Sequence, residues 1–180
     1  MTKIVGIGGS LRSDSHSMQA LHLALDRAKA LGAEVELLDL REMTLPFCDG
    51  GGDYPNYPDV ATLQNTVKQA NGLILATPEY HGSVSGVIKN ALDLMSFDEL
   101  SGKVTGLISV LGGQPNSNAL NELRLIMRWV HAWVIPEQIA IGQAWQAFEE
   151  DGTLKDDKLG ERFDAFAQSL LTNTQKLSGT

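Results

Sequence analysis

The chain has 180 residues, 43% of them hydrophobic, and a formal net charge of −8 at pH 7. This length suits one domain, spanning residues 1–180, with a well-filled core. The acidic balance argues against a nucleic-acid-binding surface, which needs clustered Lys and Arg. It also requires any anionic ligand to be held by a local pocket of hydrogen-bond donors.

Three features of the sequence predict a cytoplasmic protein. The amino terminus runs directly into a strand-like pattern, with no charged leader and no cleavable apolar segment. No apolar run approaches the roughly 20 residues that would span a bilayer. The single cysteine, Cys48, excludes an internal disulfide and a cysteine-rich metal site, and the scattered histidines share no metal-ligand spacing.

Strand-like and helix-like patterns alternate along the first half of the chain. We expect strands at Lys3–Gly8, Glu34–Leu40 and Gly72–Thr77. The third should end at Pro78, because proline cannot donate to a sheet. We expect helices at Ser17–Leu31, from Asp59 (as a cap) through Ala70, and at Ser83–Met95. The Gly-, Pro- and Asp-rich segment 48–58 predicts a long loop.

The second half continues the alternation and indicates the fold class. Strands are expected at Lys103–Leu111 and Trp133–Ile141, the latter interrupted by Pro136, and helices at Ser117–Val130 and Asp156–Lys176. Strands with continuously apolar centres between helices indicate a parallel sheet covered on both faces. Right-handed crossovers then predict a doubly wound five-stranded α/β fold that binds ligands at the carboxyl ends of its strands.

The loop after the first strand has the composition of a phosphate-binding site. It opens onto a helix amino terminus, where unpaired N–H groups and a partial positive charge favour anions. Its donors are the hydroxyls of Ser10, Ser13, Ser15 and Ser17 and the guanidinium of Arg12. The alternative is a set of turn-forming residues with Ser17 as an ordinary helix cap. The position after the first strand, and an arginine in an acidic chain, favour the anion site.

Two common nucleotide-binding motifs do not match this loop. The dinucleotide fingerprint requires a third glycine where the sequence has Leu11, and no Gly-Lys-Ser/Thr tripeptide of a Walker motif follows. The loop therefore suits a phosphomonoester rather than a pyrophosphate or triphosphate.

Two further loops are expected at the same edge of the sheet. Segment 77–86 exposes successive backbone amides that can bind the polar edge of a planar heteroaromatic ring, with Tyr80 or Pro78 against its face. A simple helix-entry turn would have a similar sequence. Segment 111–118 is again small and polar and follows a strand. Convergence of the three loops is a stronger signal than any one alone.

The sequences Gly9-Ser10-Leu11-Arg12, Pro78-Glu79-Tyr80-His81-Gly82-Ser83 and Lys89-Asn90-Ala91 resemble those of the NADPH-dependent FMN reductase family, over most of the chain. The resemblance implies a flavodoxin-like fold. It implies that the FMN phosphate is bound by Ser10, Arg12, Ser15 and Ser17. It implies that the isoalloxazine and ribityl groups are lined by Pro78, Glu79, Tyr80, His81 and Gly82, with Gly112 and Gly113 near the ring. The family commonly has Asn where this chain has His81.

The resemblance also implies an FMN-dependent NAD(P)H oxidoreductase. Hydride would pass from the nicotinamide to the bound flavin, and electrons then to a small-molecule acceptor such as a quinone or free flavin. Because the cofactor performs the chemistry, no catalytic side chain is nominated. The alternatives are a flavodoxin-type electron carrier with a protein partner, which Arg12 disfavours, and a flavin-free binding module.

Family members are often dimers or tetramers, so the resemblance implies a homodimer or homotetramer. Trp129, Trp133 and Trp145 cluster late in the chain. They are interpreted as either core residues or a subunit contact, and the expected assembly favours the second.

Overall fold

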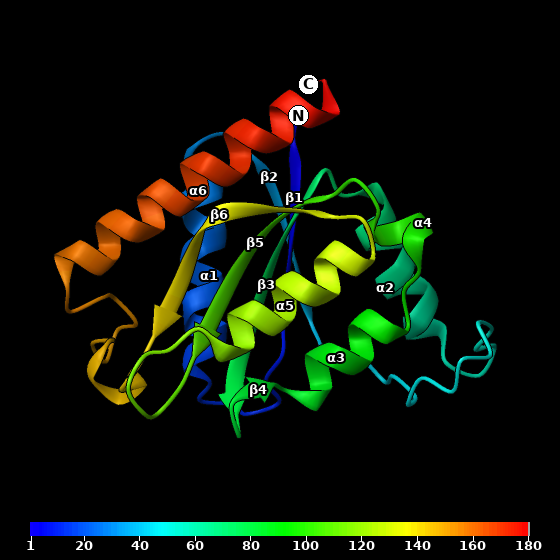
Figure 1. The fold of residues 1–180 in the computed structure, drawn as a ribbon, viewed down its shortest axis with the longest axis horizontal. Coiled ribbons are helices and arrows are strands. Elements are labelled where there is room, and N and C mark those ends of the chain that lie inside the picture. Colours follow the sequence, from blue (N-terminus) through cyan, green and yellow to red (C-terminus); the bar gives the residue numbers. More distant parts are fainter. Residues whose placement is uncertain (180) are drawn as a thin grey trace.

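The computed structural model describes residues 1–179 and has a central parallel sheet (Figure 1). Its strands lie in the order β2-β1-β3-β5-β6. Their bounds are β1 (Lys3–Gly8), β2 (Glu34–Asp39), β3 (Gly72–Tyr80), β5 (Val104–Val110) and β6 (Trp133–Ile141). A two-residue strand, β4 (Ser83–Val84), pairs antiparallel with the end of β3. This arrangement confirms the doubly wound, flavodoxin-like α/β fold.

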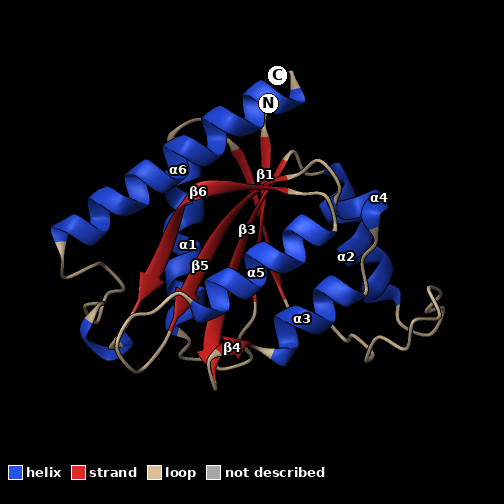
Figure 2. Ribbon diagram, viewed as in Figure 1, coloured by secondary structure: helices blue, strands red, loops and turns tan. Residues whose placement is uncertain are grey.

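Helices cover both faces of the sheet (Figure 2). One face packs against α1 (His16–Ala30) and α6 (Asp157–Ser178). The other packs against α2 (Pro58–Gln69), α3 (Gly86–Asp93), α4 (Phe97–Leu100) and α5 (Asn118–Trp129). The central strand β5 is buried at every position, whereas the edge strand β2 is mostly half-buried. Burial on both faces explains why the central strands are apolar throughout.

The strand order reverses between β1 and β3, which marks the topological switch point. The carboxyl ends of all five parallel strands lie at one edge, around β4 in the lower part of Figure 1, while both chain ends lie at the opposite edge. The loops after β1, β3 and β5 therefore converge on one edge, as the sequence predicts.

The prediction that the third strand ends at Pro78 is wrong, since β3 continues to Tyr80. Alternate residues of a strand hydrogen-bond to the same side, so the backbone groups of Ala76 and Pro78 face the same neighbouring strand. That neighbour is β1, because the carbonyl of Ala76 accepts a hydrogen bond from Gly9 N, directly after β1. Strand β1 ends at Gly8. The missing N–H of Pro78 therefore leaves no partner in the sheet unpaired. Glu79 and Tyr80 instead pair with β4.

The helix predicted to begin at Ser83 begins at Gly86, because the preceding residues form a hairpin. His81 and Gly82 occupy its two-residue turn with φ angles of 54° and 77°. Two consecutive positive φ angles are typical of a type I′ turn. Ser85 then caps α3, its Oγ accepting from the amide of Ile88 at 3.2 Å.

Other boundaries shift for local reasons. The residue that precedes α2 is Tyr57, with Pro58 in the first turn, and Asp59 accepts from the amide of Thr44 at 2.6 Å instead of capping the helix. Strand β6 is continuous across Pro136, and its pairing with β5 shifts register between Thr105 and Leu107. The short helix α4, begun by a capping box at Ser96, was not predicted.

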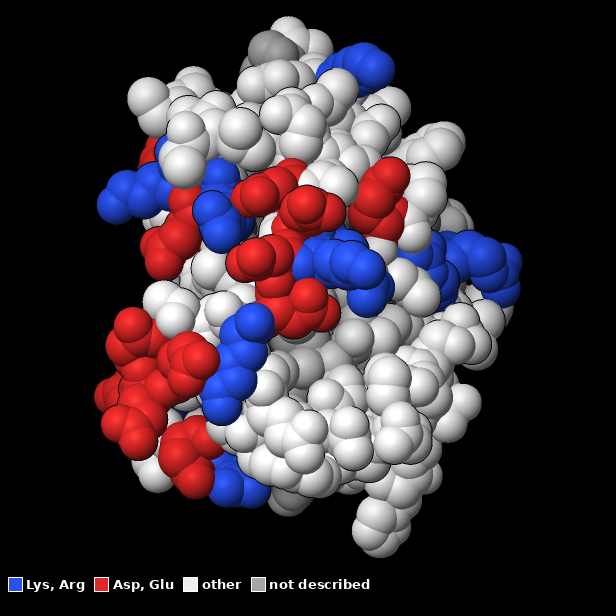
Figure 3. All heavy atoms as spheres, turned by 90° about the vertical axis from the view of Figure 1, so that its left-hand side faces the viewer, with Lys and Arg blue, Asp and Glu red and all other residues white. Residues whose placement is uncertain are grey.

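Acidic and basic side chains are interspersed on the face that Figure 3 shows. Across residues 1–179 we find no helix long and apolar enough to cross a membrane. Within the same range, no group of three His, Cys, Asp or Glu side chains is placed to hold a metal ion.

Candidate functional site

The loop between β1 and α1 is held against two other elements. The amide of Gly9 donates to the carbonyl of Ala76 in β3 at 2.7 Å, and its carbonyl accepts from Ser85 Oγ, at the start of α3, at 2.5 Å. A Cβ atom on Gly9 would lie 2.8 Å from Cβ of Ile88, closer than real contacts allow. Glycine is therefore required for this close approach, which fixes the position of the loop.

Three of the four loop serines are buried: Ser10, shortly after β1, and Ser15 and Ser17, at the amino terminus of α1. Ser15 is the cap, since its Oγ accepts from the amide of Met18 at 3.3 Å, and it lies 2.9 Å from Ser17 Oγ. The simple interpretation of Ser17 as an ordinary cap is therefore wrong. The hydroxyls and the amides at the start of α1 line one cavity and form a set of donors suited to an anion.

Arg12 is exposed and is paired with the neighbouring Asp14. Its Nε lies 3.2 Å from Oδ1 and its Nη2 2.8 Å from Oδ2 of that carboxylate. The hydrogen bonds from Arg12 hold the pKa of Asp14 below its usual value. An anionic ligand at this loop must therefore compete with Asp14 for the guanidinium.

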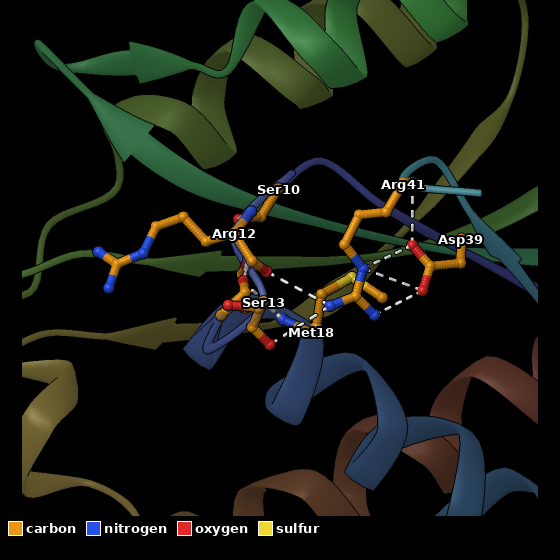
Figure 4. A network of polar contacts seen from close by, with 8 residues as sticks. Ser10, Arg12, Ser13, Met18, Asp39 and Arg41 are labelled. Atoms are coloured by element: carbon orange, nitrogen blue, oxygen red, sulfur yellow. Dashed lines mark hydrogen bonds and ion pairs between the residues drawn. The ribbon is translucent and has the colours of Figure 1, made fainter. Parts of the chain in front are cut away.

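Arg41, after β2, braces the same loop from the other side (Figure 4). Its Nε donates to both oxygens of Asp39, at 2.8 and 3.0 Å. Its Nη1 donates to the carbonyls of Arg12 and Ser13, at 3.3 and 3.4 Å. The side chain of Arg12 points away from this pair in Figure 4. The sequence alone did not predict this contact. The Asp and the Arg at the carboxyl end of a strand were the only local indication of it.

A cavity of about 300 Å³ lies at this edge and brings together residues of all three loops. Of the residues predicted to bind the cofactor, its lining includes Ser10, Arg12, Ser15, Ser17, Pro78, Glu79, Tyr80 and Gly112. It does not include His81, Gly82 or Gly113. His81 and Gly82 are exposed in the hairpin turn.

Two further residues complete the cavity: Glu79 joins two of its loops, and Trp145 contributes to its lining. The carboxylate of Glu79 accepts from Asn116 Nδ2 at 2.8 Å and from the amide of Ala119 at 3.4 Å, which joins the second loop to the start of α5. Trp145, in the 3₁₀ helix η1 (Ala144–Gln146), lines the cavity beside Gly112 and is 58% exposed. Sequence reasoning offered it as core or subunit contact, and only the return of the chain after β6 places it here.

The lining divides by chemistry into donors suited to a phosphate and flat groups suited to a ring. Serine hydroxyls and the α1 amino terminus form the first group, and Tyr80, Pro78 and Trp145 form the second. These residues fit a flavin mononucleotide.

Comparison with known proteins agrees with this chemistry. Residues 2–146 match the model of a family described as NADPH-dependent FMN reductase. The chain belongs to this family. It is an FMN-dependent NAD(P)H oxidoreductase, and FMN and NAD(P)H are its cofactor and co-substrate.

Individual relatives cover almost the whole FMN reductase chain. An FMN-dependent NADPH-azoreductase of Staphylococcus aureus is 34% identical in an alignment 170 residues long, which covers 91% of this chain and 90% of that protein. The flavoenzyme NAD(P)H:(acceptor) oxidoreductase FerB of Paracoccus denitrificans superimposes with a TM-score of 0.81 at 23% identity, covering 98% of both chains. A flavodoxin from the Archaea shares the fold, with a TM-score of 0.69 at 9% identity, 97% of this chain and 99% of the flavodoxin being covered.

Proposed function

We propose that the cavity of about 300 Å³ is the FMN site of this enzyme. The FMN phosphate would be held by Ser10, Arg12, Ser15 and Ser17, and the FMN ring and ribityl chain by Pro78, Glu79, Tyr80 and Gly112. The observation that carries this proposal is the meeting of buried serine hydroxyls and a helix amino terminus with Tyr80 and Trp145 in one cavity.

The protein's own residues position and bind, and none is required to move a proton. FMN, when bound, supplies hydride acceptance from the nicotinamide and electron delivery to a second substrate. The loop hydroxyls and the α1 amino terminus compensate the phosphate charge, which the net charge of −8 would otherwise repel. The Arg41 and Glu79 contacts hold the first and second loops in fixed places, so that the site is formed before the ligand arrives.

We propose that the acceptor is a small molecule such as a quinone, an azo compound or free flavin. The azoreductase of Staphylococcus aureus supports an azo acceptor. A flavodoxin-type electron carrier, which would require a protein partner, is less favoured because the matching family is one of reductases.

We also propose a cytoplasmic homodimer or homotetramer. Leu125, Trp129 and Trp133 are 59%, 69% and 62% exposed, and an apolar surface of this kind is typical of a subunit contact. The single cysteine is consistent with a reducing compartment.

The FMN proposal is tested by the absorbance spectrum of the purified protein after incubation with FMN and gel filtration. We expect flavin bands and, with a quinone present, oxidation of NADH or NADPH. A protein that stays colourless would overturn the FMN site. A flavin-loaded protein that oxidises neither nicotinamide would favour the electron carrier.

A further inference from the structure

A second cavity, of about 490 Å³, lies on the other side of Tyr80 from the first. Its roof is the segment 41–48 after β2, which we call the strap. The strap contributes Met43, Leu45 and Phe47 to the lining, and the opposite wall has Leu11, Tyr80 and Val87. The size and the apolar, aromatic lining are typical of small-molecule sites.

The charged and amide groups in this lining already have partners. The guanidinium of Arg41 is engaged by Asp39 and by two loop carbonyls. The amide of Asn90 donates to the carbonyl of Pro46 and accepts from the amide of Cys48, both at 2.9 Å. A charged ligand would lose its hydration here without finding a free counter-charge in the lining, whereas an uncharged ligand would not. The phenol of Tyr80 can supply one hydrogen bond to a carbonyl oxygen.

Hydrogen bonds anchor the backbone of the strap on both sides of an exposed aromatic ring. Asn90 bonds the residues on both sides of Phe47, and Cys48 Sγ lies 3.2 Å from the carbonyl of Asp93. Phe47 itself is 89% exposed. A solvent-exposed phenyl on an anchored backbone, at the rim of an apolar cavity, gains buried area when it closes over a flat ligand.

We propose that this second cavity binds an uncharged planar aromatic molecule and discriminates against anionic ones. Tyr80 lines both cavities and so separates this ligand from the mononucleotide by one side chain. This preference for an uncharged aromatic ligand does not rest on the proposed function.

The binding preference is measured without turnover. The uncharged, non-reducible probe 2-naphthol and its anionic counterpart naphthalene-2-sulfonate are titrated into the purified protein, with whatever FMN it retains and no nicotinamide. Methionine-methyl ¹³C NMR reports the site, with Met43 in the lining and the fully buried Met127 of α5 as internal reference. We expect 2-naphthol to shift Met43 and to bind at least about tenfold more tightly than the sulfonate. Equal affinities, or an unmoved Met43, would overturn the proposal.

Two variants locate the probe. A Cβ on Gly86 would meet no atom within 4 Å, so Gly86→Leu adds volume to the wall without displacing a neighbour. Phe47→Ser removes the exposed ring, and Phe97→Ser, a half-exposed phenylalanine on α4 outside the cavity lining, is its control. We expect about tenfold weaker binding of 2-naphthol in the first two variants and no change in the third. Equal effects of Phe47→Ser and Phe97→Ser would contradict the site.

The unfolding midpoint in urea shows that each variant is folded. Because the readout needs neither flavin nor nicotinamide, naphthol binding can succeed where FMN binding fails. Conversely, a protein that lacks this preference could still bind FMN, so its result would not count against the proposed FMN site.

Discussion

At the scale of single residues, the pairing of Arg12 with Asp14 is the feature with the clearest consequence for the cofactor. Both side chains are exposed, at 68% and 74%, and the carboxylate occupies two donors of the guanidinium. A phosphate arriving at the loop meets a neutralised arginine and an adjacent negative charge. We therefore expect Asp14 to oppose FMN binding and Arg12 to support it.

We predict opposite effects for the two members of this pair. Arg12→Ala should weaken FMN binding about tenfold, because a charge-assisted hydrogen bond to the phosphate is lost. Asp14→Asn should tighten binding several-fold, because it frees the guanidinium and removes a like charge. Fluorescence titration of FMN measures both. Arg128→Ala, at the end of α5, is the control and should change nothing; an unchanged affinity in Arg12→Ala would remove Arg12 from the site.

The backbone conformation of His81 leads to a second prediction at the scale of single residues. Its φ of 54° lies in the left-handed region. Asn adopts this region at a lower energetic cost than His, especially before glycine in a type I′ turn. His81→Asn should therefore raise the free energy of unfolding, by up to about 1 kcal/mol. FMN affinity should stay the same, since His81 lies outside the cavity lining. Urea unfolding decides it, and a lower midpoint in the variant would contradict strain at this position.

At the scale of elements, the carboxyl end of β2 is joined to the first loop by Asp39 and Arg41. The hydrogen bonds from Arg41 lower the pKa of Asp39. A carboxylate with a lowered pKa stabilises the fold above its unfolded pKa of about 4 and loses this contribution as pH falls through the lowered value. We therefore expect the join between β2 and the loop to weaken as the pH falls below about 4.

We predict that Asp39→Asn lowers the free energy of unfolding at pH 7 by about 1 kcal/mol. The difference from the parent protein should shrink as the pH falls below about 4, because the parent then loses the same charge. Urea midpoints between pH 7 and pH 3 measure it. Other acidic groups affect parent and variant alike, so a difference that stays constant with pH would exclude Asp39 as the titrating group.

The β6 edge of the sheet is protected by arginines from two helices. Nη2 of Arg124, in α5, donates to the carbonyls of Ile135 and Pro136 at 3.0 and 3.1 Å, and Arg162, in α6, donates to the carbonyl of Gln138 at 3.1 Å. These bonds occupy carbonyls of β6 that would otherwise be open to another strand. An assembly of this protein is therefore expected to use side-chain packing rather than continuation of the sheet.

At the scale of the whole molecule, the proposed assembly gives a further prediction. Trp129→Ser should lower the oligomer mass in sedimentation experiments, since it removes a large exposed aromatic side chain from the proposed contact. Leu177→Ser, near the end of α6, replaces an exposed leucine elsewhere and should leave the mass unchanged. A mass that is equal in all three proteins would place the contact elsewhere or show a monomer.

Local patterning alone was sufficient for the fold class, the order of strands and helices and the three converging loops. Apolar strand centres and helical spacing are properties of short segments, and the right-handed crossover rule turns their order into a topology. Family membership followed from the motifs around Ser10 and Pro78. The site residues at these motifs stay predictions until FMN binding is measured.

The tertiary structure decided the features that depend on residues far apart in the chain. Arg41 reaches a carbonyl 29 residues away, and Cys48 bonds to Asn90, 42 residues away, so neither contact has a local sequence pattern. β3 could continue through Pro78 only because β1 had already ended, which depends on the register between strands. The proposed phosphate-binding loop depends on residues close together in the sequence, whereas the strap, the position of Trp145 and the second cavity exist because separate elements meet.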